Sequence, residues 1–253
     1  MSRRDPSSTT PTELETLYPG RSVIPPDPAL AFVDALLEDY ADEWLTKAMF
    51  HYRWAFAADV ANAAAILPRW FRTNQPESDA VANGKMFAER QIGRLAVVGS
   101  NEITAPVIEE SYRRLLRLLD AHLIHSRFVL GDRPASSDLG LFGQLTQLVG
   151  FDPTSAAIAH QQAPRVVAWV EVAEDLSGLE PEERDWTPRD DGHAGFTISA
   201  SCAASTAFSS LTLSGFFAHR KTSIGSNSCT EFTARGSSAP ARRPNVGIFS
   251  VWG

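Results

Sequence analysis

Three side chains with the chemistry of a ligand pocket recur along one stretch of the sequence. Trp44, Lys47 and His51 are spaced three and four residues apart, which places them on one face of an α-helix. An aromatic ring, an amine and an imidazole on one face can line a pocket for an apolar substrate. In the alternative, Trp44 belongs to the core and the other two side chains face solvent. The spacing leaves both interpretations open.

The other groups of reactive side chains indicate no further site. His122 and His125 share a helix face and offer two metal ligands, but no nearby spacing supplies a third and a fourth, so we expect no metal. Four carboxylates around Trp44 fit the solvent face of an amphipathic helix: Glu38, Asp39, Asp42 and Glu43. The motifs GxSxG, GxGxxG and the phosphate-binding loop are absent from the sequence. We therefore assign no catalytic residue and no cofactor.

Helical periodicity predicts the elements that position these residues. Asp27 followed by Pro28 is a strong helix start, and apolar residues then recur every three or four positions, so we expect one long helix to about Trp54. Further helices are expected over residues 57–66, ending near Pro68, then over 79–94, from 106, over 139–148 and over 164–173. No alternating strand pattern occurs in residues 28–175. The prediction is an all-α fold, a bundle of about six helices with irregular termini.

A polar turn, GDRPASSD, opens the helix expected over 139–148. The first backbone N–H groups of a helix have no partner within it, and a buried helix end must find acceptors for them.

The stretch GDRPASSDLGLFGQL resembles the helix-capping signature of the C-terminal, all-helical domain of glutathione transferases. In that family a Ser or Thr caps the central helix, and an Asp three residues later bonds back to the capping residue. Here Ala135 occupies the position of the capping Ser or Thr, and Asp138 occupies the position of the aspartate. Ser136 replaces the missing capping side chain only if the motif is shifted by one residue. The segments FDPTSAAIAHQQAPRVVAWVE and PALAFVDALLEDYADEWLTKAMFHYRW are also similar to bacterial members, and the resemblance covers residues 12–185.

This resemblance implies three segments. Residues 1–27 correspond to the last helix of a thioredoxin-like domain and its linker, residues 28–178 to the helical domain, and residues 179–253 form an irregular, serine-rich tail. A shifted reading frame is an alternative origin of the sequence after about residue 190, because charge, serine content and cysteine usage all change there.

The implied function is glutathione-dependent conjugation or reduction of small electrophiles, with glutathione as co-substrate. Only about 18 residues precede the linker, and a complete thioredoxin-like domain needs more. We therefore expect a truncated transferase that is inactive alone, whose helical domain forms the wall of a substrate pocket. The alternatives are a non-catalytic helical module that binds an apolar ligand or dimerises, and the remnant of a damaged gene.

Charge and hydropathy restrict the partners. Residues 192–253 hold five basic residues and one acidic residue, so the first 191 residues carry a net charge of −11 and repel nucleic acid. The sequence has no apolar run long enough for a membrane span, and MSRRDPSSTT lacks the apolar stretch of a signal peptide. We expect a cytoplasmic protein that avoids nucleic acid and membranes, with a small apolar electrophile or ligand and a second copy of itself as partners.

Overall fold

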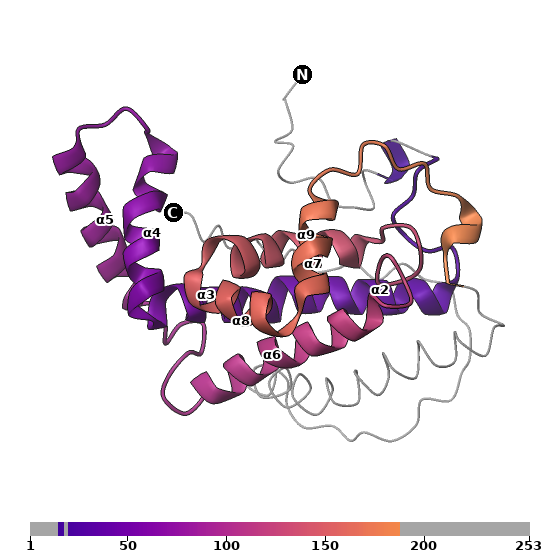
Figure 1. The fold of residues 1–253 in the computed structure, drawn as a ribbon, viewed down its shortest axis with the longest axis horizontal. Coiled ribbons are helices and arrows are strands. Elements are labelled where there is room, and N and C mark those ends of the chain that lie inside the picture. Colours follow the sequence, from indigo (N-terminus) through magenta and orange to yellow (C-terminus); the bar gives the residue numbers. More distant parts are fainter. Residues whose placement is uncertain (1–14, 18–19, 188–253) are drawn as a thin grey trace, which may run out of the picture. The chain divides into compact units, whose positions relative to one another are not determined.

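The computed structural model describes residues 15–17 and 20–187, and this part of the chain is helical without a β-strand (Figure 1). Eight α-helices lie in it: α2 (Pro28–Tyr40), α3 (Thr46–Ala55), α4 (Ala57–Phe71), α5 (Glu77–Ile92), α6 (Ala105–His122), α7 (Ser136–Leu145), α8 (Pro153–Gln162) and α9 (Pro164–Ala173). The predicted all-α class is confirmed. Residues 1–14, 18–19 and 188–253, which include most of the predicted serine-rich tail, lie outside the described residues.

The long helix predicted from Pro28 exists as one helical run with a change of winding inside it. Asp27 Oδ1 accepts hydrogen bonds from the Ala29 and Leu30 N–H groups and so caps the start of α2. A π-helical segment, η2 (Ala41–Leu45), then joins α2 to α3. A second π-helical segment, η3 (Thr146–Phe151), follows α7.

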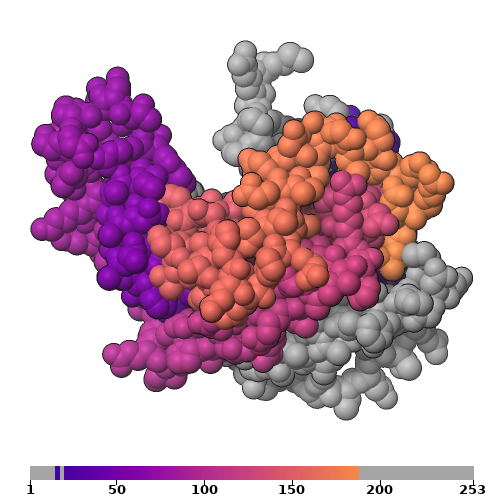
Figure 2. All heavy atoms as spheres, in the orientation of Figure 1, coloured from indigo at the N-terminus to yellow at the C-terminus, as the bar shows by residue number. Residues whose placement is uncertain are grey.

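The predicted end of a helix near Pro68 is wrong, because α4 continues through Pro68 to Phe71. Proline has no N–H, so it cannot donate to the carbonyl of Ala64 one turn earlier. The α4–α5 hairpin, which projects from the other described helices in Figure 2, packs closely at this point. A Cβ on Gly84 of α5 would lie only 2.2 Å from the Ala64 carbonyl oxygen. Glycine therefore lets α5 approach the turn that Pro68 leaves open.

The buried start of α7 is capped from another helix. Its N-cap residue is Ala135, which has no side-chain acceptor. Asp34 of α2 takes this role: its Oδ1 accepts the Ser137 N–H at 2.8 Å, and its Oδ2 accepts the Ser136 hydroxyl at 2.6 Å. Asp34 is almost fully buried, and this contact fixes α2 against α7.

Helices α8 and α9 begin in the same way, each with the N–H of its second residue bonded to an aspartate of a distant helix. The Thr154 N–H donates to Asp59 Oδ1 of α4 at 2.9 Å, and the Arg165 N–H donates to Asp120 Oδ1 of α6 at 2.8 Å. The N-cap side chains of both helices make no capping bond. We call Asp34, Asp59 and Asp120 the interhelical caps.

A buried ion pair explains why α8 needs a cap from outside. Asp152 holds the N-cap position of α8, but its two oxygens accept from Arg53 Nε at 2.8 Å and Arg53 Nη2 at 2.9 Å. Burial raises the pKa of Asp152, and the bonds from Arg53 act against that rise. Both oxygens of Asp152 are therefore bonded to Arg53 of α3, and the start of α8 is capped by Asp59 instead.

Replacing Gly84 by alanine tests the close packing of α4 and α5. The added Cβ collides with the Ala64 carbonyl, so we expect Gly84→Ala to lower the free energy of unfolding by roughly 1–3 kcal/mol in a urea titration. Gly143→Ala is the control, because a Cβ on Gly143 in α7 meets nothing within 4 Å. It should be neutral or raise stability by up to about 1 kcal/mol. Equal effects of the two substitutions would refute the packing argument.

Removal of the Asp34 carboxylate tests the cap of α7. Asp34→Ala leaves the buried Ser137 N–H without its acceptor, so we expect a loss of about 1–3 kcal/mol in the same titration. Asp39, an exposed carboxylate on the same helix, provides the control, and Asp39→Ala should change stability by about 0.5 kcal/mol or less. A loss for Asp34→Ala no larger than for the control would mean that the contact does not stabilise the fold.

Candidate substrate-facing site

The first candidate residue, Trp44, lies in the π-helical segment η2 and reaches α6. Its indole Nε1–H donates to Ser111 Oγ at 2.8 Å, and the Ser111 hydroxyl donates onward to the Ile108 carbonyl at 2.7 Å. The Trp44 side chain is half-buried. One edge of the ring is thus fixed by a hydrogen bond while part of the residue stays accessible.

Lys47 lies beside Trp44 one turn further along the helix. Its Nζ is 5.5 Å from the centroid of the Trp44 ring, within the range of a cation–π interaction, and the residue is half-buried. The two side chains form a partly exposed pair of an aromatic ring and a cation, which we call the Trp44–Lys47 pair.

His51 differs from this pair because it is buried between α3, the turn at Ser100 and α6. Its Nδ1 lies 2.8 Å from Ser100 Oγ, and its Nε2 lies 3.5 Å from Glu109 Oε1 without forming a hydrogen bond to any described residue. Burial lowers the pKa of His51, while the nearby Glu109 acts in the opposite direction. His51 is therefore not part of the partly exposed surface that the Trp44–Lys47 pair forms.

The capping residues are gathered at the start of α7. Asp138 Oδ2 accepts the Ala135 N–H at 2.9 Å and Oδ1 accepts the Val129 N–H at 2.9 Å, so this carboxylate joins the helix to the preceding loop. Ser136 does not act as a local cap, because its hydroxyl donates to Asp34. Burial raises the pKa of Asp138 to about 7, the two N–H bonds act against that rise, and the charge of Asp34 adds to it.

Comparison with known protein families gives a match for this chain. Residues 61–171 match the family model described as glutathione S-transferase, C-terminal domain. This part of the chain is similar to the C-terminal domain of glutathione S-transferases. Searches among curated proteins and among solved structures give no match.

The match confirms the resemblance read from GDRPASSDLGLFGQL, since that stretch lies within it. The matched range runs from α4 into α9 and includes one of the interhelical caps, Asp120, whereas Asp34 and Asp59 precede it. Trp44, Lys47 and His51 precede the matched range, so the match does not bear on these three residues.

Of the two histidines considered as metal ligands, His122 has a structural contact. It is the last residue of α6, and its Nε2 lies 3.0 Å from the Phe128 carbonyl oxygen. Within residues 15–17 and 20–187, no three His, Cys, Asp or Glu side chains gather as metal ligands would. No helix in the same ranges combines the length and the apolar composition that a membrane span requires.

The raised pKa of Asp138 gives a testable pH dependence. Between pH 4 and pH 7 the folded protein keeps a proton on Asp138, whereas the unfolded chain, with the ordinary pKa of 3.8, has lost it. In this pH range proton binding to Asp138 favours the folded state. The contribution of Asp138 to the free energy of unfolding is therefore complete below pH 4 and is lost as the pH rises to 7. We expect Asp138→Asn to remove this fall in unfolding free energy when wild type and variant are titrated at several pH values. An unchanged slope in the variant would contradict the assignment.

Proposed function

We propose that this protein acts as a glutathione transferase-like protein whose helical domain holds a small apolar electrophile against the Trp44–Lys47 pair, with glutathione as the co-substrate. The observation that carries the proposal is the position of Trp44. It lies in a π-helical segment, a feature that is frequent at functional sites, in a chain whose residues 61–171 are similar to the C-terminal domain of glutathione S-transferases.

The pair supplies the interactions that such a substrate needs. An aryl electrophile stacks on the indole ring, whose Nε1–H bond to Ser111 restricts its rotation. When the glutathione thiolate forms a carbon–sulfur bond to the ring carbon, negative charge develops on the arene before the leaving anion departs. The Lys47 ammonium lies where it can stabilise that charge. We assign no residue of the chain to activation of the thiol.

A second candidate function is a non-catalytic helical module that binds an apolar ligand or a second copy. Phe32 and Leu36 favour it, because they are one turn apart on α2 and are 70% and 49% exposed. Exposed apolar side chains on one helix face are a common feature of contact surfaces. In this case the domain binds an apolar ligand or a second copy through this surface and catalyses no reaction.

Binding and turnover of 1-chloro-2,4-dinitrobenzene with glutathione test the proposal. Loss of the ring or of the cation removes stacking and charge stabilisation, so we expect Trp44→Ala and Lys47→Gln each to weaken arene binding about fivefold or more, measured by NMR titration. Trp70→Ala and Lys85→Gln, at exposed positions of α4 and α5, are the matched controls and should bind as wild type does.

Retention on immobilised glutathione together with conjugate formation would support the enzyme. Arene binding without either result would support the ligand-binding module, and sedimentation would then show whether a second copy associates. Loss of arene binding equally in the Trp44, Lys47 and control variants, or no saturable binding in wild type, would refute the role of the pair.

A further inference from the structure

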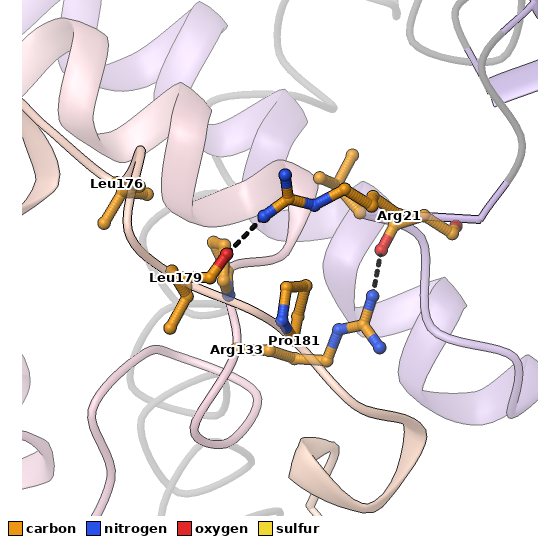
Figure 3. Close-up of a pocket in the computed structure, with 8 residues that line it drawn as sticks. Arg21, Arg133, Leu176, Leu179 and Pro181 are labelled. Carbon is orange, nitrogen blue, oxygen red and sulfur yellow. Dashed lines mark hydrogen bonds between the residues drawn. The ribbon is translucent and has the colours of Figure 1, made fainter.

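A pocket of about 140 Å³ lies away from the Trp44–Lys47 pair, between residues 21–23, residues 133–134 and residues 176–181 (Figure 3). Most of its lining is apolar: Val23, Pro134, Leu176, Leu179 and Pro181. A dry apolar cavity of about 150 Å³ is large enough to bind benzene. The pocket therefore has room for a ligand of about six non-hydrogen atoms.

The segments around the pocket are fixed to one another, so its shape is built into the fold. Arg133 Nη2 donates to the Ser22 carbonyl at 2.6 Å and Nη1 donates to the Glu182 carbonyl at 3.0 Å, which ties three segments together. The guanidinium carbon lies 4.4 Å from the centroid of the Trp186 ring. The Asp132 N–H donates to the Asp185 carbonyl at 2.8 Å and holds the returning chain in place.

Two guanidinium groups give the pocket its charge. Arg133 is only 2% exposed, and Arg21 lies across the pocket from it with one nitrogen bonded to the Leu179 carbonyl (Figure 3). A buried cation requires compensation by an acceptor or an anion. The bonds of Arg133 to backbone carbonyls supply acceptors but no negative charge.

The acidic side chains near the two arginines compensate them weakly. Glu183 Oε1 lies 3.3 Å from Arg133 Nη1, and Glu180 Oε2 lies 3.9 Å from Arg21 Nη2, but these carboxylates are 75% and 87% exposed. Solvent screens such partners strongly. The Nε of Arg133 is buried and has no hydrogen-bond acceptor among the described residues. The pocket thus combines apolar walls, two cations and an unused buried donor.

From these features we infer that the pocket is a binding site for a small carboxylate with a short hydrocarbon chain. The carboxylate pairs with the accessible guanidinium of Arg21, while the hydrocarbon chain contacts Leu176 and Leu179. A neutral ligand of the same size gains only the apolar contacts. The site uses none of the residues of the proposed transferase function and does not depend on it.

Titration of the full chain with butanoate, followed by NMR, tests this site. Butanoate has six non-hydrogen atoms, and its neutral match is butanamide. We expect saturable binding of butanoate, with a dissociation constant at least fivefold lower than that of butanamide, because only the anion is attracted by the arginines. Arg21→Gln should weaken butanoate binding at least fivefold. Arg117→Gln should leave it unchanged, because Arg117 is an equally exposed arginine on α6 that pairs with Glu110.

Leu176→Trp provides a test that leaves both charges in place. The larger side chain fills the pocket, so butanoate binding should be lost while the thermal unfolding curve stays close to that of wild type. Leu176 is partly exposed and Arg21 lies at the surface, so these variants test the site without removing the buried Arg133. Absence of saturable butanoate binding, equal affinity for butanamide, or unchanged binding in Arg21→Gln or Leu176→Trp would overturn the inference.

Discussion

The N–H groups at the starts of three helices, which have no partner within their own helix, are the constraint on which this fold depends. None of α7, α8 and α9 is capped by its own N-cap side chain. In each of them the N–H of the second residue donates to an aspartate of a distant helix, namely Asp34, Asp59 or Asp120. A buried N–H without an acceptor, such as that of Ser137 at the start of α7, costs about 1–3 kcal/mol. The three contacts join α2 to α7, α4 to α8 and α6 to α9.

This arrangement also positions the candidate site. With α2 fixed to α7 by Asp34, the helical run that continues from α2 brings Trp44 to Ser111 of α6 through the π-helical segment. The run then carries His51 into its buried place beside Ser100. The Trp44–Lys47 pair is therefore held by a frame whose junctions are hydrogen bonds between helices, and a ligand at that pair would meet a surface that is already ordered.

Sequence patterns predicted most helices correctly but not the contacts between them. The sequence pattern assigned no role to Asp34, although this residue lies on the same stripe as Leu30 and Ala41, which are buried. A carboxylate inside an apolar stripe is the signal of an interhelical cap, but its partner N–H lies about a hundred residues away, where periodicity gives no information. The helix α8 was missed because its sequence, PTSAAIAHQQ, is mostly small and polar and has no clear apolar stripe. At the turn of α4 that contains Pro68, Gly84 of a neighbouring helix packs closely, and local rules for proline do not include such a contact.

The most direct test of the interhelical caps is amide hydrogen exchange of Ser137, Thr154 and Arg165 in wild type and in Asp34→Ala, Asp59→Ala and Asp120→Ala. If each aspartate serves as the acceptor for one helix start, each variant will show faster exchange mainly at its own amide and its neighbours in that helix. Exchange at all three amides that stays as in wild type, or that rises equally in every variant, would contradict this account.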